Sequence, residues 1–331
     1  MRISDLGGET AIIELIRDRY GAATGGGLAL GIGDDAALVD IGGRFLIVTT
    51  DLLVENTHFR MDISEPYLVG WKSAAVNISD IAAMGGEPTY SFVSIGLPDV
   101  EVETVESIYQ GLHDANAAFG SVIAGGDTVR SAAGIVINVA QLGVVEPEAV
   151  ARRDGAQAGD AILVTNTLGD SLAGLELLLK LGLADARRAS GFCVERHLKP
   201  EPRVHEARAA VKTGRVRSMM DLSDGLSSDL AKLCAASGVG ARVRSDALPL
   251  SSDIYIAASR LDADPVALAA SGGEDYELLI TCEPGDAPDL IAAIGSTGSI
   301  ACVIGEIVEG SGVVLVSSEG EKPMPASWQH F

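Results

Sequence analysis

Short apolar runs alternate with helical patterns along the whole chain, and this alternation constrains the fold more than any other feature. Residues 45–48 predict a strand, and Pro66, which suits the first turn of a helix, opens a helix predicted to end at Met84 before Gly85-Gly86. Layers of strands and helices around a common core are the usual outcome of such alternation. The pattern therefore predicts a fold of the α/β class, with mixed sheets of the α+β kind.

The chain is long enough for two domains, with 331 residues of which 47% are hydrophobic. Glu146-Pro147-Glu148 separates two halves of similar character, so we predict domains at 1–148 and 149–331. The other predicted strands are 91–97, 121–124, 134–145, 161–164, 216–220, 276–282 and 301–308, and the other predicted helices are 102–119, 172–181 and 226–236.

A formal net charge of −22 argues against partners that bind basic surfaces. Nucleic acids and anionic membranes are such partners, and we expect neither. The sequence contains no uninterrupted apolar run of about 18 residues, the length needed to span a membrane. The N-terminus shows no apolar core of a signal peptide. The cysteines at 193, 234, 282 and 302 form no C-x-x-C pair, which argues against a zinc ribbon. We therefore expect a cytoplasmic protein with reduced thiols.

Five short acidic motifs stand at predicted strand ends, in glycine loops or inside an apolar helix. They are Gly33-Asp34-Asp35-Ala36-Ala37, Thr49-Thr50-Asp51, Asn77-Ile78-Ser79-Asp80, Gly125-Gly126-Asp127-Thr128 and Asp221-Leu222-Ser223-Asp224-Gly225, with Gly272-Gly273-Glu274-Asp275 as a candidate sixth. Taken alone, an aspartate after a strand is usually a turn former or a helix N-cap. Five such motifs in one chain indicate a shared site instead.

Asp80 is the most informative of these carboxylates. It lies on an otherwise apolar helix, where Asn77 shares its face and the nearest basic residue, Lys72, is two turns away. A carboxylate is costly to bury without a partner, and a metal ion is a natural one.

The residue types around the carboxylates favour magnesium. Hard divalent cations bind oxygen ligands, and Thr49, Thr50 and Ser223 add hydroxyls next to Asp51 and Asp221. These motifs contain neither histidine nor cysteine, which argues against zinc or copper. Magnesium with phosphate oxygens completing its shell is the predicted occupant.

Other catalytic chemistries lack their motifs. The chain has no G-x-x-x-x-G-K-[ST] loop, no G-x-S-x-G elbow and no H-E-x-x-H pair. His58, seven residues after Asp51, is the one histidine close to an acidic motif, although a structural role is its default interpretation.

In this order, the motifs resemble those of the thiamine-monophosphate kinase family, within the superfamily typified by aminoimidazole ribonucleotide synthetase. The resemblance covers nearly the whole chain. It is carried by Gly31-Ile32-Gly33-Asp34-Asp35-Ala36-Ala37, Thr49-Thr50-Asp51-Leu52-Leu53-Val54-Glu55-Asn56-Thr57-His58-Phe59, Trp71-Lys72-Ser73-Ala74-Ala75-Val76-Asn77-Ile78-Ser79-Asp80-Ile81-Ala82-Ala83-Met84-Gly85-Gly86, Gly125-Gly126-Asp127-Thr128, Asp221-Leu222-Ser223-Asp224-Gly225-Leu226 and Gly273-Glu274-Asp275-Tyr276-Glu277-Leu278.

The resemblance implies a role for each matched position. It implies magnesium ligands at Asp34, Thr49, Thr50, Asp51, Asp80, Asp127, Asp221 and Asp224, with Asp51, Asp80 and Asp127 as the catalytic carboxylates. It implies ATP contacts at Tyr109, Gly126, Asp127, Arg153 and Ser223, although the adjacent Arg152 is an alternative to Arg153. It implies thiamine phosphate contacts at His58, Glu274 and Trp328.

The resemblance also implies the two-domain architecture of aminoimidazole ribonucleotide synthetase, with a homodimer formed through the N-terminal sheet. The implied reaction is phosphorylation of thiamine monophosphate by ATP with several Mg²⁺ ions. Those ions would offset the repulsion between acidic ligands and two anionic substrates. An acceptor phosphate is already ionised near neutral pH, so no general base is required.

Two alternatives stay open. One is another ATP-using enzyme of the superfamily. Selenophosphate synthetases carry a reactive cysteine or selenocysteine near the N-terminus, whereas no cysteine precedes residue 193 here. The hydrogenase-maturation relative ends in a modified cysteine, whereas this sequence ends in Trp328-Gln329-His330-Phe331. Aminoimidazole ribonucleotide synthetase lacks the match at residues 55–59. The other alternative is a non-catalytic binder of nucleotides or divalent cations.

Overall fold

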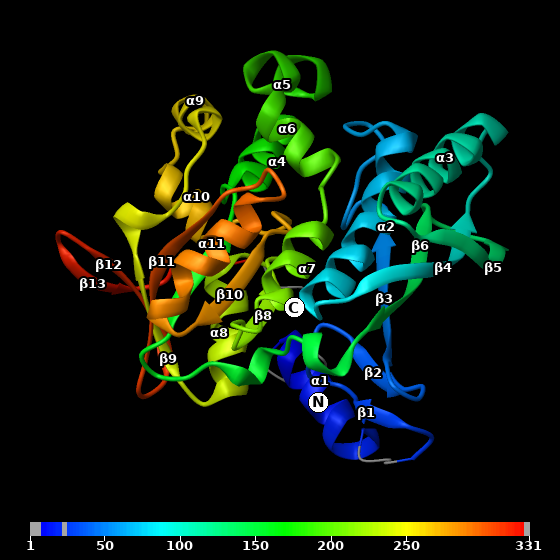
Figure 1. The fold of residues 1–331 in the computed structure, drawn as a ribbon. Coiled ribbons are helices and arrows are strands. Elements are labelled where there is room, and N and C mark those ends of the chain that lie inside the picture. Colours follow the sequence, from blue (N-terminus) through cyan, green and yellow to red (C-terminus); the bar gives the residue numbers. More distant parts are fainter. Residues whose placement is uncertain (1–7, 22–24, 328–331) are drawn as a thin grey trace.

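The computed structural model describes residues 8–21 and 25–327, in which two mixed β-sheets form the framework of the molecule (Figure 1). The first sheet has the order β1-β2-β3-β6-β4-β5. Its strands are β1 (Leu28–Leu30), β2 (Ala37–Asp40), β3 (Phe45–Val54), β4 (Glu87–Leu97), β5 (Val122–Arg130) and β6 (Val136–Val145). Only the β4–β5 pair is parallel among the neighbours of this sheet.

Helices α2 (Pro66–Ala83) and α3 (Val102–Ala118) pack on one face of the first sheet (Figure 1). Two glycines let these helices approach closely. A Cβ added to Gly70 would lie 1.9 Å from the carbonyl oxygen of Ile108, and one added to Gly111 would lie 1.9 Å from that of Tyr67. The contact is therefore backbone against backbone, and no larger side chain fits without a shift.

The second sheet has the order β13-β12-β9-β11-β7-β10-β8. Its strands are β7 (Ala161–Thr165), β8 (Ser218–Asp221), β9 (Gly240–Arg244), β10 (Leu278–Cys282), β11 (Ala301–Val308), β12 (Gly312–Ser317) and β13 (Gly320–Pro323). The remaining helices are α1 (Glu9–Tyr20), α4 (Asp170–Leu181), α5 (Leu183–Ala189), α6 (Gly191–Leu198), α7 (Val204–Lys212), α8 (Leu226–Ser237), α9 (Ser252–Leu261), α10 (Pro265–Ser271) and α11 (Ala287–Gly295).

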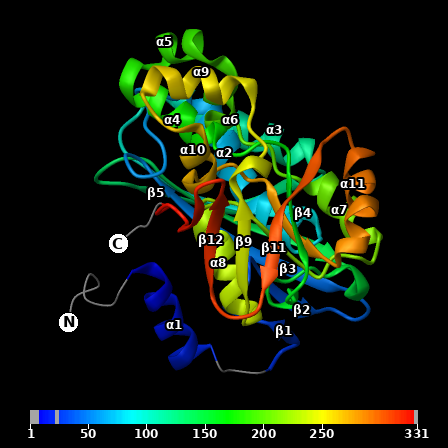
Figure 2. The ribbon, with the colours of Figure 1, turned by 90° about the vertical axis from the view of Figure 1, so that its left-hand side faces the viewer.

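The second sheet lies between α8 and the pair α7 and α11, while α4, α5, α6 and α9 gather beyond one end of it (Figure 2). Helix α2 stands where the two halves meet, because it also packs against α7 and β8 (Figure 1). The largest core cluster accordingly spans both halves, with Ile81 of α2 in the same cluster as Leu278 and Ile280 of β10. The helix that carries Asp80 is thus held by both sheets.

Two acidic motifs lie inside strands, whereas the sequence placed them after strand ends. β3 continues through Thr49-Thr50-Asp51 to Val54, and β5 continues through Gly125-Gly126-Asp127 to Arg130. The apolar run ends at Val48, but β6 pairs with β3 along its whole length and so keeps the polar residues extended. Across the described ranges, no helix is long and apolar enough to cross a membrane.

Candidate active site

Three buried or half-buried carboxylates converge where α2, β8 and the loop before β2 meet. One oxygen each of Asp35, Asp80 and Asp221 lies within 4.8 Å of the others, and we call these three residues the acidic cluster. They come from segments far apart in the sequence, so only the tertiary fold brings them together. The fold thus places two of the predicted metal ligands, Asp80 and Asp221, in one cluster.

Hydroxyl and amide groups fix the orientation of these acids. The Thr49 hydroxyl donates to Oδ2 of Asp80 at 2.5 Å, and the Ser79 hydroxyl donates to Oδ2 of Asp221 at 2.5 Å. One turn before Asp80, Asn77 accepts a hydrogen bond through Oδ1 from the backbone N–H of Asp51 at 2.9 Å. The shared helix face predicted for Asn77 and Asp80 therefore docks α2 onto β3.

The carboxylates repel one another in a buried environment. Burial and the charge of Asp35 raise the pKa of Asp34 to about 6 and that of Asp221 to about 8. Burial raises the pKa of Asp51 to about 6. Burial and the charges of Asp51 and Asp221 raise the pKa of Asp80 well above its ordinary range. A cation bound at the cluster would relieve this cost.

Asp35 belongs to the cluster, although the predicted ligand set contained Asp34 and not Asp35. Its side chain is buried, and its Oδ2 atom has no hydrogen-bond partner within the described residues. An orphaned buried carboxylate oxygen beside two more carboxylates fits a hard divalent cation, since such cations bind oxygen ligands. The sequence shows the adjacent pair Asp34-Asp35, but it does not show which of the two side chains faces the cluster.

Arg153 is the arginine at the cluster. Its guanidinium forms an ion pair with Asp35, with Nε 3.2 Å from Oδ1, and its backbone N–H donates to Oδ2 of Asp34 at 3.3 Å. Arg152 instead pairs with Asp154 on the surface. Of the two adjacent arginines, Arg153 is therefore the one whose side chain contacts the acidic cluster.

A second acidic pair surrounds the loop before α8. Asp229 accepts hydrogen bonds from the backbone N–H groups of Asp224 at 2.9 Å and Gly225 at 3.0 Å. Lys232 forms ion pairs with both Asp224 and Asp229. Ser223 precedes Asp224 in this loop and is half-buried. Asp229 and Lys232 order the predicted ligand Asp224, a role that their helical spacing alone did not reveal.

Glu274 and His58 are two of the predicted substrate contacts. Burial favours a higher pKa for Glu274, but the charge of Lys72 and the hydrogen bond from it, together with His197 and His58, lower this pKa. His58 accepts a hydrogen bond from the backbone N–H of Val54 through Nδ1 at 3.0 Å, so its ring proton is on Nε2. Trp328, the third predicted substrate contact, lies outside the described residues.

Two predicted ligands point away from the acidic cluster of their own chain. Thr50 alternates with Thr49 and Asp51 along β3, so its exposed side chain lies on the opposite face, where its hydroxyl accepts from Asn138. Asp127 pairs with Ser94, which is exposed on that same outer face. The side chains of these two predicted magnesium ligands therefore do not join the acidic cluster of the same chain.

Register also separates Asp127 from the cluster along the sheet. Gly126 pairs with Val93, Val93 with Val139, and Val139 with Asp51. These three strand spacings correspond to roughly 14 Å. Tyr109 lies near this far edge, half-buried on α3, which packs against β5. The predicted ATP contacts thus form two groups within one chain.

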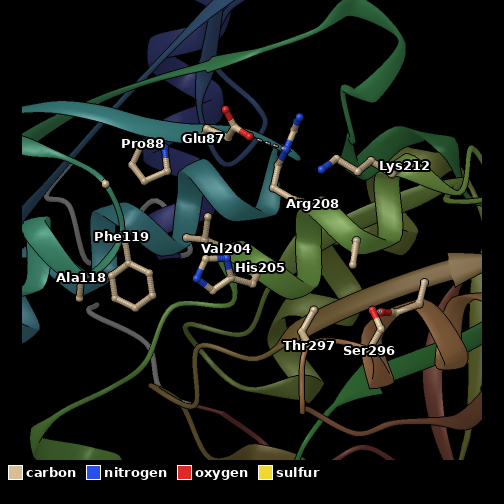
Figure 3. A pocket seen from close by; sticks show the side chains of 13 residues that line it. Glu87, Pro88, Ala118, Phe119, Val204, His205, Arg208, Lys212, Ser296 and Thr297 are labelled. Carbon is tan, nitrogen blue, oxygen red and sulfur yellow. Dashed lines mark hydrogen bonds and ion pairs between the residues drawn. The ribbon is translucent and has the colours of Figure 1, made fainter.

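A cavity elsewhere in the described residues contains none of the predicted site residues. Its volume is about 730 Å³, and it lies between the start of β4, the end of α3, α7 and α11 (Figure 3). Arg208 projects from α7 towards Glu87, with Nε 3.3 Å from Oε1, and it also pairs with Glu146. This cavity has one carboxylate in its wall, so it does not offer the oxygen ligands of the acidic cluster.

Comparison with known proteins agrees with this geometry. Residues 33–145 match the family described as AIR synthase related protein, N-terminal domain, and residues 157–317 match its C-terminal domain. The thiamine-monophosphate kinase of Aquifex aeolicus is 35% identical over 332 residues, covering 100% of both chains. The chain belongs to the thiamine-monophosphate kinase family. The enzyme of that name from Escherichia coli K12 is 38% identical over 91% of each chain.

A solved structure of the family supports the same assignment. The structure described as AaThiL complexed with AMPPCP and TMP has a TM-score of 0.85 and 35% sequence identity, and the match covers 100% of this chain and 99% of that chain. The family resemblance, the mixed α/β fold with two domains and the prediction of a phosphate-accepting phosphotransferase are confirmed. The boundary at 148 stays a prediction.

Proposed function

We propose that this enzyme transfers the γ-phosphoryl group of ATP directly and in line to thiamine monophosphate, which yields thiamine diphosphate and ADP. The observation that carries the proposal is the acidic cluster of Asp35, Asp80 and Asp221, with Arg153 beside it, in a chain of this family. The ligands named for the solved relative, AMPPCP and TMP, support the choice of substrates.

Magnesium is the proposed metal, in several copies. The orphaned oxygen of Asp35 and the oxygen-only donor set fit it. Asp34, Thr49, Asp51, Asp80, Asp221 and Asp224 are the proposed ligands of this chain, now joined by Asp35, while Thr50 offers only its backbone to this side. Bound Mg²⁺ supplies charge neutralisation for the phosphates of donor and acceptor.

The protein groups then position the reactants. Asp51 and Asp80 are the proposed catalytic carboxylates; Thr49 donates to the carboxylate of Asp80, and Asn77 accepts from the backbone N–H of Asp51. Arg153 and Ser223 are proposed to contact ATP from this side of the site. His58 and Glu274, with Trp328, are proposed to contact thiamine monophosphate. The acceptor phosphate carries its own negative charge, so the enzyme needs to align it rather than deprotonate it.

We also propose a homodimer through the outer face of the first sheet. That face exposes large apolar side chains, with Leu52 and Tyr90 each 51% exposed and Phe92 41% exposed. A sheet face that exposes several large apolar side chains is typical of a protein interface. Asp127 lies on the same face, so we propose that it serves the acidic cluster of the partner subunit, together with Gly126 and Tyr109.

Mixed dimers test this arrangement. Asp80→Asn and Asp127→Asn should each be inactive alone, and refolding them together should restore roughly a quarter of wild-type activity, because half of the dimers are mixed and one of their two sites is intact. Sedimentation should show a dimer. Inactive mixed dimers would mean that both residues act within one chain, and a monomer in sedimentation would remove the dimer altogether.

The cytoplasm is the proposed location. The four cysteines are free thiols in the structure, and those at 193, 234 and 282 are buried. Unpaired cysteines are usual where the environment is reducing. Location of a fluorescent fusion in cells checks this proposal, and export of the fusion would contradict it.

The deciding experiment for the reaction is ATP turnover with and without thiamine monophosphate. We expect ADP release only when thiamine monophosphate is present, with thiamine diphosphate formed in equal amount. EDTA should abolish turnover, and Mg²⁺ or Mn²⁺ should restore it. A non-catalytic binder would release no ADP, another superfamily enzyme would need a different acceptor, and full activity without metal would exclude the magnesium mechanism.

A further inference from the structure

A buried lysine lies at the junction of the two halves and is not among the predicted site residues. The Lys72 side chain on α2 is 4% exposed, and its Nζ atom donates to Oε2 of Glu274 at 2.9 Å. Lysine is almost never buried this completely unless it is paired. The two residues stand 202 positions apart in the sequence, so the pair joins the two halves of the molecule.

His197 completes the surroundings of the lysine. Nζ of Lys72 lies 3.5 Å from Nε2 of His197, and the ammonium can only donate, so Nε2 accepts and the ring proton is on Nδ1. That Nδ1 atom lies 3.1 Å from Oε2 of Glu274 and 3.2 Å from the hydroxyl of Ser171. Burial and the charge of Lys72 lower the pKa of His197 to about 3, so the ring is neutral. Of these three side chains, Lys72 is the positively charged partner of Glu274.

These contacts use only one of the two carboxylate oxygens. Oε2 of Glu274 faces both Lys72 and His197, whereas Oε1 accepts no hydrogen bond from the described residues. The Glu274 side chain is 28% exposed, against 4% for Lys72 and 7% for His197. Glu274 is therefore the most exposed side chain of the three, and its Oε1 atom is not used by Lys72 or His197.

Hydrogen bonds also fix the backbone around Glu274. Glu274 has φ = 62°, in the left-handed region that a non-glycine residue rarely adopts, and its N–H donates to the carbonyl of Ser223 at 2.7 Å. The next residue, Asp275, is buried and accepts from the N–H of Gly169 at 2.6 Å. A strained position that is fixed at both backbone and carboxylate indicates that the direction of this side chain matters.

We infer that Lys72 is a positioning residue for the substrate: it holds Oε2 of Glu274 so that Oε1 is presented to the thiamine moiety. This inference rests on the proposed function, in which Glu274 contacts thiamine monophosphate. Lys72 itself acts only through Glu274. Because Asp80 follows Lys72 by two turns of the same helix, α2 sets the spacing between the substrate contact and the acidic cluster.

The sign of one kinetic change separates positioning from simple electrostatics. The thiazolium ring carries a permanent positive charge, so a lysine that acted only through its charge on that ring would repel it, and Lys72→Met would lower KM. Positioning predicts the opposite. We expect Lys72→Met to raise KM for thiamine monophosphate roughly tenfold, the scale of one lost charge-assisted hydrogen bond, with KM for ATP within about twofold.

A double variant tests whether Lys72 works through Glu274. In a Glu274→Ala background, adding Lys72→Met should leave KM for thiamine monophosphate unchanged, because the group that Lys72 orients is already gone. Equal additive effects in both backgrounds would overturn the inference, as would a lower KM in the single variant. If Lys72→Met does not fold, the test is the comparison of KM for thiamine monophosphate between the double variant and Glu274→Ala. A double variant that also fails to fold would show that Lys72 is a structural residue.

Arg208→Met is the matched control. Arg208 also bridges the two halves, through Glu87 and Glu146, and its side chain is 11% exposed, but it lines the cavity of Figure 3, which contains none of the predicted site residues. We expect it to lower Tm without a selective rise in KM for thiamine monophosphate, and the same selective rise in this control would overturn the inference. If the wild type does not use thiamine monophosphate, the proposed function fails first; if it does and Lys72→Met keeps the wild-type KM, only the role of Lys72 fails.

Discussion

Asp80→Asn should make the metal-free protein more stable while it removes activity. The substitution is nearly isosteric, and the amide can still accept the hydrogen bond from Thr49. It removes one negative charge from a buried cluster whose oxygens lie within 4.8 Å of one another. The folded state therefore loses a repulsion that the unfolded chain does not contain, and the enzyme loses a proposed metal ligand.

The structure sets the scale of this effect. Two ionised carboxylates at 4.8 Å repel by roughly 3.5 kcal/mol at an effective dielectric constant of about 20. Protonation limits the cost, since a buried acid takes up a proton when the repulsion exceeds the cost of doing so. For Asp34, a pKa raised from 3.8 to about 6 corresponds to about 3 kcal/mol at neutral pH. In a chain of this length, 3 kcal/mol is roughly 4 °C in Tm.

The same shifts give the pH dependence. Acids whose pKa is higher in the folded state bind more protons there than in the unfolded chain, so stability falls as the pH rises from the unfolded to the folded pKa. With pKa values of about 6 for Asp51 and about 8 for Asp221, the metal-free wild type should lose stability between about pH 4 and pH 8. The loss should be smaller in Asp80→Asn.

Thermal unfolding with and without Mg²⁺ is the assay. At pH 8 in EDTA, we expect Asp80→Asn to melt a few degrees above the wild type, roughly the 4 °C estimated above. Mg²⁺ should raise the Tm of the wild type and raise that of the variant much less. A variant that melts below the wild type in EDTA, or that gains as much from Mg²⁺, would refute the reasoning; wild-type turnover would return Asp80 to a structural role.

Two further outcomes are expected. Gly111→Ala should lower Tm by roughly 4 °C, because its Cβ would lie 1.9 Å from the carbonyl oxygen of Tyr67. Gly191→Ala is the control and should leave Tm unchanged, because its Cβ would have no atom within 4 Å. Equal Tm values for the two variants would show that α2 and α3 can move apart without cost. Trp328→Ala should raise KM for thiamine monophosphate, with KM for ATP and Tm little changed, because an aromatic face favours a flat cationic ring; an unchanged KM in a folded variant would remove Trp328 from the site.

The residues that sequence alone placed correctly are those with strong local signals. Helix α2 was predicted from Pro66 and a long apolar stretch, and it runs from Pro66 to Ala83. Strand β11 was predicted at its observed bounds, Ala301–Val308, because a mostly apolar run is flanked there by turn residues. Short elements such as β1, which has 3 residues, carry too few side chains for any period to show.

What tertiary structure decided is which side chains face one another. Strand alternation and register, not composition, turn Thr50 and Asp127 to the outer face of the first sheet. Asp35 rather than its neighbour completes the acidic cluster, because the loop before β2 packs against α2 and β8. The pairing of Lys72 with Glu274 depends on two halves docking across 202 residues of sequence, and no local pattern encodes such a contact. Sequence therefore determined which chemistry the chain can perform, and packing determined which atoms are placed to perform it.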